Sequence, residues 1–292
     1  MFELKQVGKS TYYFDLPVKV GVYNYSGNDV VIIDSGSSNS YGKRILKMVR
    51  DKCFNITAIF NTHCHADHVG GNAYIQKETG CKIYCPEIDC QAVNFPIINQ
   101  ILLTGSYPLK ELNNKLFLAE ESNAEPLSED VLPDGLEIID LKGHSLGMVG
   151  FKTRDDAYFL ADALVSEETL EKYIITYLIS PADYLNSLKF IETLPKGIYI
   201  PAHANETDNI KPLVKVNRNY VNKTIETILN FCKLQKSFEE VVAYIFSQNS
   251  VEFNVSQFEL VGSTIRSYLS YLEAQEKLEL VIENNILYYK AK

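Results

Sequence analysis

Residues 61–72, NTHCHADHVGGN, concentrate side chains that bind metal ions. The segment holds His63, His65, Asp67 and His68, and so three of the five histidines in the chain. Neutral imidazoles and carboxylates are the ligands that zinc and related divalent ions take in a compact polyhedron. His63 and His65 stand two apart at a strand end and point the same way, so they can reach one metal. Asp67 and His68 follow where the chain bends into a helix, and they can reach a second metal nearby.

The remaining histidines, His144 and His203, each end a predicted buried strand, in LEIIDLKGH and IYIPAH. A single histidine in such a place is more often a hydrogen-bonded core residue than a ligand. Taken together, however, all five histidines lie at strand ends on what should be one rim, and this favours ligation. AYFLADALV is predicted to be a strand that carries Asp162, and a charged side chain inside such an apolar run needs a partner such as a metal.

The elements that must position these residues read as alternating strands and helices. TYYFDL and VKVGVYNY suit a strand pair, and DVVIIDSGSS predicts a buried strand that turns at Asp34. A helix is expected over 40–52, followed by the strand ITAIF, and the motif lies just beyond that strand's carboxyl end. Gly70 and Gly71 would let the next backbone pack closely, and Gly80 would end the following helix. DVVIID and AYFLAD both finish on aspartate, which suggests two similar halves packed sheet against sheet.

The later part of the chain divides into three stretches. Residues 91–130 predict a helical insertion with loops, which serves either as a cover on the sheet or as a lid over a pocket. Ser180 and Pro181 are a good cap and first residue for a helix. Beyond about residue 210, helices are expected over 211–233, 237–246 and 261–277, then a hairpin at Asn284-Asn285. This is the order of a small winged-helix domain, so we predict a catalytic domain over 1–209 and a helical, winged-helix-like domain over 210–292.

The charge distribution disfavours some partners. The net charge of the 292 residues is −9, and residues 1–210 carry 18 Lys+Arg against 28 Asp+Glu, whereas residues 211–292 carry 10 against 9. An acidic body does not attract nucleic acid or anionic membranes at long range. The six cysteines form no CxxC pair, and neither a secretory signal nor a membrane-spanning run is visible, so we expect a cytoplasmic protein with reduced thiols.

These motifs resemble those of the metallo-β-lactamase superfamily. THCHADHVGGN is similar to its THxHxDHxGGN signature, and VIIDSG, GHSLG, FLADAL and PAHA follow in the superfamily's order, over roughly residues 10–205. The resemblance implies an α+β chain with an αββα sandwich and two divalent metals at one edge. It implies that Asp162 bridges the two metals and that Asp34 orients the ligands by hydrogen bonding. The other ligands implied are His63, His65 and His144 for the first metal, and Asp67, His68 and His203 for the second.

The activity implied is hydrolysis by a hydroxide that bridges the two metals, with Asp67 assisting proton movement to the leaving group. Zinc is the expected metal, and iron and manganese suit the same ligands. Zinc β-lactamases of the best-known kind have arginine in place of His68 and cysteine in place of Asp162, so a β-lactam is not the expected main substrate. The ligand set is similar to that of glyoxalase II, lactonases and RNase Z, whereas PAHANE departs from the usual glyoxalase II motif around the last ligand.

We therefore predict a hydrolase of a small-molecule ester, thioester or lactone. Two alternatives remain open. One is an RNA or phosphodiester hydrolase. The other is a persulfide dioxygenase, a family that shares these motifs but uses one iron held by His63, His144 and Asp162. For the C-terminal region we expect packing, pocket closure or homodimer formation rather than nucleic-acid binding.

Overall fold

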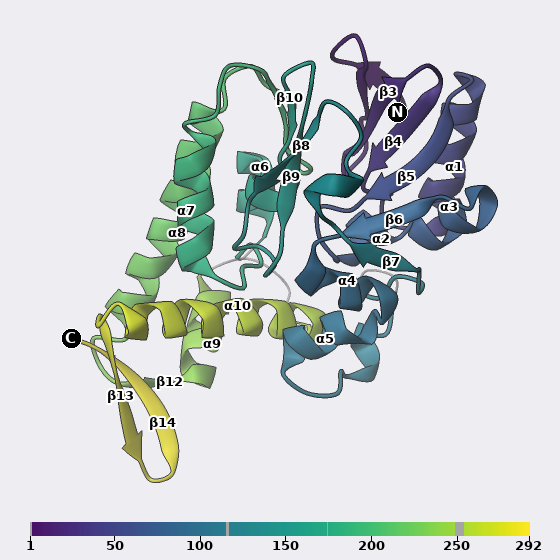
Figure 1. The fold of residues 1–292 in the computed structure, drawn as a ribbon. Helices are drawn as coiled ribbons and strands as arrows, with labels where there is room; N and C mark the ends of the chain where they lie inside the picture. Colours follow the sequence, from purple (N-terminus) through teal and green to yellow (C-terminus); the bar gives the residue numbers. More distant parts are fainter. Residues whose placement is uncertain (1, 115–116, 174, 249–253) are drawn as a thin grey trace.

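The computed structural model describes residues 2–114, 117–173, 175–248 and 254–292. Two β-sheets lie face to face, and helices cover their outer sides, as the expected αββα layering requires (Figure 1). Side chains from both sheets fill the space between them. The rings of Phe60 and Phe151, one from each sheet, meet edge to face with centroids 5.9 Å apart. Such aromatic pairs add about 0.5–1.5 kcal/mol beyond the burial of their surface, so this contact helps to hold the sheets together.

The first sheet has seven strands in chain order, β1 to β7. The first four are antiparallel, as the alternating aromatic and β-branched residues predict, and β4, β5, β6 and β7 then run parallel. The carboxyl ends of β4 and β5 therefore lie side by side, with Ile33 opposite Phe60. The strands are β1 Leu4–Gln6, β2 Thr11–Phe14, β3 Val20–Ser26, β4 Asp29–Ile33, β5 Asn55–Phe60, β6 Lys82–Cys85 and β7 Ala124–Pro126.

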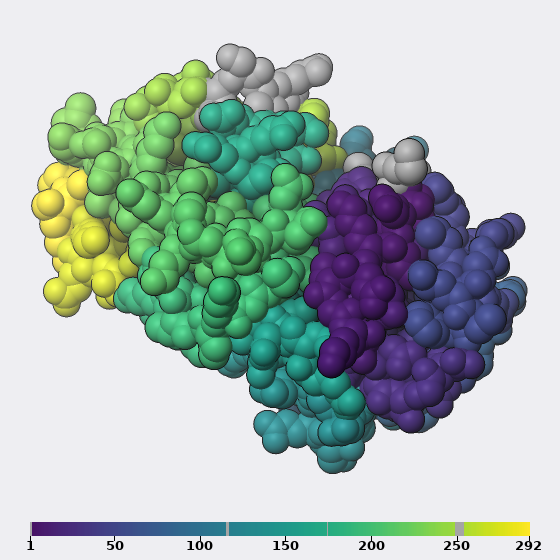
Figure 2. Space-filling view, turned by 90° about the horizontal axis from the view of Figure 1, so that it is seen from above, coloured from purple at the N-terminus to yellow at the C-terminus, as the bar shows by residue number. Residues whose placement is uncertain are grey.

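The second sheet has the order β11-β10-β9-β8. Its strands are β8 Leu136–Asp140, β9 Val149–Thr153, β10 Ala157–Phe159 and β11 Ile198–Ile200. The two sheets are joined near the N-terminus, where the Lys19 backbone N–H donates to the Ala202 carbonyl at 3.2 Å. The space-filling view shows the N-terminal segment, in purple, directly beside the segment in green (Figure 2).

The helices begin and end close to where the sequence predicts. Gly80 ends α3 with a φ of 70°, and the Ser180 side chain caps α7 by accepting from the Asp183 N–H. The helices of this part of the chain are α1 Asn39–Asp51, α2 Ala66–Val69, α3 Asn72–Thr79, α4 Glu87–Asn94, α5 Ile97–Thr104, α6 Glu167–Lys172 and α7 Pro181–Ile191. Short 3₁₀ turns lie at η1 Lys110–Leu112, η2 Glu129–Val131 and η3 Ala161–Ala163.

Two predicted elements differ from the structure. Residues 91–130, of which 115–116 lie outside the described residues, are not purely helical, because β7 extends the first sheet beside β6. The first helix of this stretch, α4, already begins at Glu87. Asp162 does not lie within a strand: β10 ends at Phe159, and Asp162 lies in η3 just beyond it. The strand end, rather than the strand, therefore presents the aspartate.

The C-terminal region contains the predicted helices and hairpin, but its last helix is a third difference, because it begins at Val255 rather than at residue 261. They are α8 Lys211–Phe231, α9 Phe238–Ser247, α10 Val255–Ala274, β13 Leu278–Glu283 and β14 Ile286–Ala291, and a short strand, β12 Lys236–Ser237, pairs with β14. One buried cluster runs from Tyr158 in β10 and Leu188 in α7 to Val221 in α8 and Leu269 in α10. Core packing thus continues across residue 210, and the division at 209/210 and the winged-helix class stay predictions. No helix in the described part of the chain is long and apolar enough to cross a membrane.

Candidate metal centre

The two adjacent strand ends of the first sheet build one side of the site. Beyond Phe60, the chain places Thr62 and His63 in the interior, and the Asp34 N–H donates to the Phe60 carbonyl at 3.0 Å. Asp34 adopts a positive φ of 63°, a conformation that aspartate tolerates better than most residues. This turn points its carboxylate at the start of the histidine motif.

Two glycines let the motif pack against the neighbouring loop. A Cβ on Gly70 would overlap the Ser37 backbone, and one on Gly71 would overlap the Ser35 carbonyl oxygen. The close approach allows the Ser35 N–H to donate to the His68 carbonyl at 2.7 Å, while the Gly71 N–H donates to the Ser35 hydroxyl at 3.0 Å. The predicted role of these glycines, close backbone packing beneath the site, is confirmed.

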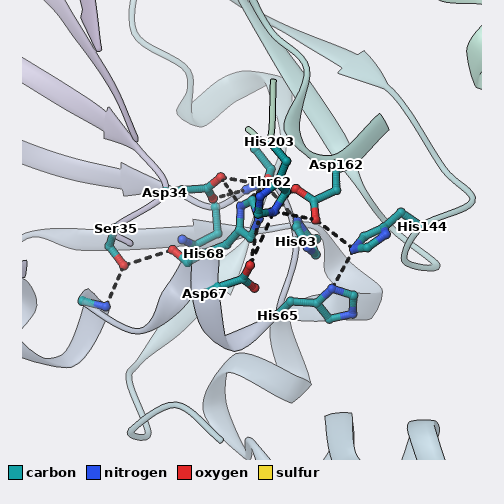
Figure 3. A network of polar contacts seen from close by, with 12 residues as sticks. Asp34, Ser35, Thr62, His63, His65, Asp67, His68, His144, Asp162 and His203 are labelled. Atoms are coloured by element: carbon teal, nitrogen blue, oxygen red, sulfur yellow. Dashed lines mark hydrogen bonds and ion pairs between the residues drawn. The ribbon is translucent and has the colours of Figure 1, made fainter. Parts of the chain in front are cut away.

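The structure brings all seven predicted ligand side chains to one place (Figure 3). They form two groups, and within each group one potential ligand atom per residue lies within 4.8 Å of the others. We call them the first group, which is His63, His65 and His144, and the second group, which is Asp67, His68, Asp162 and His203. Each group takes residues from both sheets, because His144, Asp162 and His203 follow β8, β10 and β11.

Asp162 lies between the two groups. Its Oδ2 is 3.2 Å from His144 Nε2 in the first group and 3.3 Å from His203 Nε2 in the second, and its Oδ1 is 2.9 Å from His68 Nε2. The close-up shows the carboxylate directed at ligands on either side (Figure 3). This is the place that a bridging carboxylate would occupy.

Hydrogen bonds on the far side of two imidazoles fix which nitrogen faces the site. Asp34 Oδ2 lies 2.8 Å from His68 Nδ1, and the carboxylate also accepts from the Thr62 N–H and hydroxyl at 2.8 Å each. His144 Nδ1 lies 3.0 Å from the Tyr177 carbonyl oxygen. Because a carboxylate or carbonyl oxygen only accepts, Nδ1 carries the proton in both rings and Nε2 is left to bind metal.

The two groups differ in charge. Burial holds the pKa of His63 well below its ordinary value and lowers that of His144 to about 4, so the first group is neutral. Burial also acts to lower the pKa of His203, but the Asp162 and Asp67 carboxylates outweigh it and raise it to about 10. Burial opposes ionisation of Asp67, yet His68 and His203 hold its pKa at about 2. The second group is therefore a set of paired charges, in which a divalent cation would replace the protons on the imidazoles.

Unpartnered atoms show that the residues suit a metal. Among the described side chains, His63 Nε2, His68 Nε2 and Asp162 Oδ1 are buried and make no hydrogen bond. His68 Nε2 and Asp162 Oδ1 lie 2.9 Å apart, but their alignment is not that of a hydrogen bond. Buried polar atoms without partners cost free energy. A cation in the first group would satisfy His63 Nε2, and a cation in the second group would satisfy His68 Nε2 and Asp162 Oδ1. The donor set of imidazole and carboxylate fits divalent zinc, iron or manganese.

Two contributors were not identified from the sequence. Thr62 connects Asp34 to the motif, and Asp89 of α4 accepts a hydrogen bond from the Cys64 thiol at 2.9 Å. Cys64 thus points away from the ligands that flank it, as strand alternation predicts. All six cysteines are free thiols.

Comparisons with known proteins agree with this geometry. Hydroxyacylglutathione hydrolase of Pelagibacter ubique (strain HTCC1062) is 26% identical over 233 residues, which is 75% of this chain and 84% of that protein. A probable metallo-hydrolase of Bacillus subtilis (strain 168) is 24% identical over 71% of this chain and 90% of its own length. A beta-lactamase domain protein from Burkholderia ambifaria has the same fold, with a TM-score of 0.75 at 16% identity over 99% of this chain and 94% of that one.

The family profile that matches is that of the metallo-beta-lactamase superfamily, over residues 14–203. This span begins at the last residue of β2 and ends at His203, so it includes strands β3 to β11 and all seven side chains of the two groups. The chain belongs to the metallo-beta-lactamase superfamily.

Proposed function

We propose that this protein is a dinuclear metal-dependent hydrolase of an ester, thioester or lactone. The observation that carries the proposal is the pair of ligand groups with Asp162 between them. A single metal would need only one group, and the other would remain as a costly set of buried polar atoms. Two groups that share one carboxylate suit two ions held close together.

Two divalent ions, when bound, would polarise the substrate's carbonyl oxygen and lower the pKa of a water towards neutrality. The protein's own residues would do the rest. Asp67 has a side chain that is 39% exposed, and its Oδ2 lies 3.5 Å from His203 Nε2. It therefore faces both the ligands and the solvent, so it can hold or pass a proton to the leaving group. His65 and His203 are also only partly buried, which leaves the substrate an approach on this side.

Thioesters are the first substrates to test. Several relatives, including those from Pelagibacter ubique and Hyphomonas neptunium, are named hydroxyacylglutathione hydrolase. An acyl carbonyl is a suitable target for this type of centre, because its developing negative charge would lie beside cations. The family match ends at residue 203 and says nothing of residues 204–292, so the acyl and thiol parts need a panel rather than one compound.

The first test is elemental analysis of protein expressed without added metal. About two ions of zinc, or of a mixed composition, per chain are expected, followed by hydrolysis within a panel of thioesters, lactones and phosphodiesters. One iron per chain, with oxygen uptake in the presence of a persulfide, would replace the proposal with the dioxygenase. Absence of metal even after reconstitution would remove the ligand assignment altogether. His203→Ala is a useful variant, since it should retain the first group's ion and lose the second's.

A further inference from the structure

A buried carboxylate outside the two ligand groups connects the segments that carry the first group. Asp89 in α4 is 4% exposed. Its Oδ1 accepts from the Cys64 thiol at 2.9 Å, and its Oδ2 accepts from the Ser145 hydroxyl at 3.2 Å and the Gly147 N–H at 3.0 Å. None of the ion pairs among the described residues includes Asp89, so these donors alone offset the loss of its hydration.

The donors belong to two segments that come from different sheets. Cys64 lies between His63 and His65, just beyond β5 of the first sheet. Ser145 and Gly147 lie just after His144, in the loop that joins β8 and β9 of the second sheet. One side chain therefore holds the segments of all three histidines of the first group, although it is hydrogen-bonded to none of their rings.

Two further contacts show that this junction is closely fitted. A Cβ on Gly147 would lie 2.5 Å from Asp89 Oδ2, so any larger residue would push the loop away from the carboxylate. On the other side, the Asn99 side chain of α5 donates to the Cys64 carbonyl at 3.3 Å. Helices α4 and α5 together thus hold the backbone between the two histidines from outside the site.

We propose that Asp89 is a positioning residue that sets the distance between the His63–His65 segment and His144, and thereby the affinity of the first group for its metal. This inference rests on the proposed function. The proposed role of Asp89 concerns the first group alone, because His68 of the second group is held by different residues, Asp34 and Ser35. Loss of Asp89 should weaken one metal position and leave the other unchanged.

The test compares Asp89→Asn and Asp89→Ala with the wild type, all loaded with zinc and then titrated with a chelator. An asparagine keeps the shape but offers one acceptor oxygen, so at least one of the three donors loses its partner. Residues that orient metal ligands typically change affinity about 10–100-fold, and we expect about tenfold weaker retention of one ion in Asp89→Asn and more in Asp89→Ala. Cobalt(II)-substituted protein should show a changed absorption spectrum in the same variants.

Asn94→Ala is the matched control. Asn94 lies on the same helix, and its side chain makes two backbone hydrogen bonds, to the Ala124 carbonyl at 3.0 Å and from the Ala124 N–H at 2.7 Å. These reach β7 rather than the ligand segments. Asn94→Ala should lower the melting temperature and leave the chelator titration and the cobalt spectrum as in the wild type. Equal changes in Asn94→Ala and Asp89→Asn would overturn the inference, because the effect would then be general loosening.

Site selectivity is tested by combining Asp89→Asn with the loss of one group. In a His203→Ala background, where the first group is intact, Asp89→Asn should weaken the remaining ion about tenfold. In a His144→Ala background, where the second group remains, it should have no effect. Equal effects in both backgrounds would refute a role specific to the first group. If Asp89→Ala fails to fold, metal retention is compared in Cys64→Ala and Cys64→Ser instead. Serine keeps a donor to Asp89 and should retain the metal, whereas alanine lacks the donor and should retain it less well.

The outcomes also separate this inference from the proposed function. A wild type that holds two ions, with Asp89→Asn indistinguishable from it, would leave the hydrolase proposal in place and reject the role of Asp89. A wild type that binds no metal would reject both.

Discussion

Replacing Asp34 with asparagine should change which nitrogen of His68 carries its proton. Asp34 is almost fully buried, and its carboxylate accepts from the Thr62 N–H at Oδ1 and from His68 Nδ1 at Oδ2. The Thr62 N–H can only donate, so the asparagine oxygen must take the Oδ1 position. The NH₂ group then faces His68 Nδ1, which has to accept. The proton moves to Nε2, the nitrogen that faces Asp162, and this nitrogen can no longer bind metal.

The size of the effect follows from the bond that is lost. A hydrogen bond to a charged group contributes about 1.5–3 kcal/mol, and each 1.4 kcal/mol is about tenfold in affinity. The second group should therefore bind its ion about 10–100-fold more weakly, which agrees with the usual effect of residues that orient metal ligands. Asparagine tolerates the left-handed conformation at this position, so the fold should persist.

The assay is retention of zinc against increasing chelator, with circular dichroism to show that the variant is folded. Asp155→Asn is the matched control, because Asp155 Oδ2 likewise accepts from a backbone N–H, that of Ser10 at 2.7 Å, and from a threonine hydroxyl, that of Thr11 at 2.8 Å. It contacts no ligand of either group, so it should cost stability without changing metal retention. Wild-type retention in Asp34→Asn would refute the reasoning about the His68 tautomer.

Three further predictions concern stability. Removing the metals should lower the melting temperature, since a ligand at 100 times its Kd stabilises a fold by about 2.7 kcal/mol; a chelated sample that melts with the untreated one would contradict this. In the metal-free protein, burial would lower the pKa of His203, but Asp162 and Asp67 raise it to about 10. The protonated imidazole therefore stabilises the fold fully below its unfolded pKa of 6.5, and this stabilisation is lost as the pH rises through 10. Calorimetry should show that the melting temperature of the metal-free protein falls over that pH interval relative to the metal-loaded form. Melting temperatures that change in parallel with pH in the two forms would reject this prediction. Asn217→Ala leaves the buried N–H and carbonyl of Val165 without their side-chain partner. Urea unfolding should show a free energy of unfolding lower by about 2–5 kcal/mol, whereas a loss below 1 kcal/mol would show that water replaces the amide.

The ligands could be predicted because their residue types are rare and their places regular. Three histidines lie in the segment that follows β5, and His144 and His203 follow β8 and β11; parallel strands bring their carboxyl ends to one edge. Asp34 could be found for the same reason. The position of Asp162 relative to its strand could not, because the apolar run AYFLADALV continues past Phe159 and hides the turn at Ala161, which has a φ of 47°.

Asp89 could not be predicted, because its partners are distant in sequence. Cys64 and Gly147 lie 25 and 58 residues away, and only the packing of α4 against both loops brings them together. The strand β7 has only three residues, which is too short to show the alternation of apolar and polar residues that predicts a strand. The early start of α10 had a local signal that the prediction did not use: Asn254 caps it by accepting from the Gln257 N–H.

Each ligand group takes side chains from both sheets, and this has a consequence for how the protein folds. Neither sheet alone can present a complete metal position, so an intermediate with one sheet formed would hold metal more weakly than the native protein. Metal binding should follow the docking of the two sheets, a step that depends on contacts between residues far apart in sequence and is therefore slow. Ions added during refolding would be taken up only as the last native contacts form, and from then on they would slow unfolding, because the sheets could not separate without releasing them.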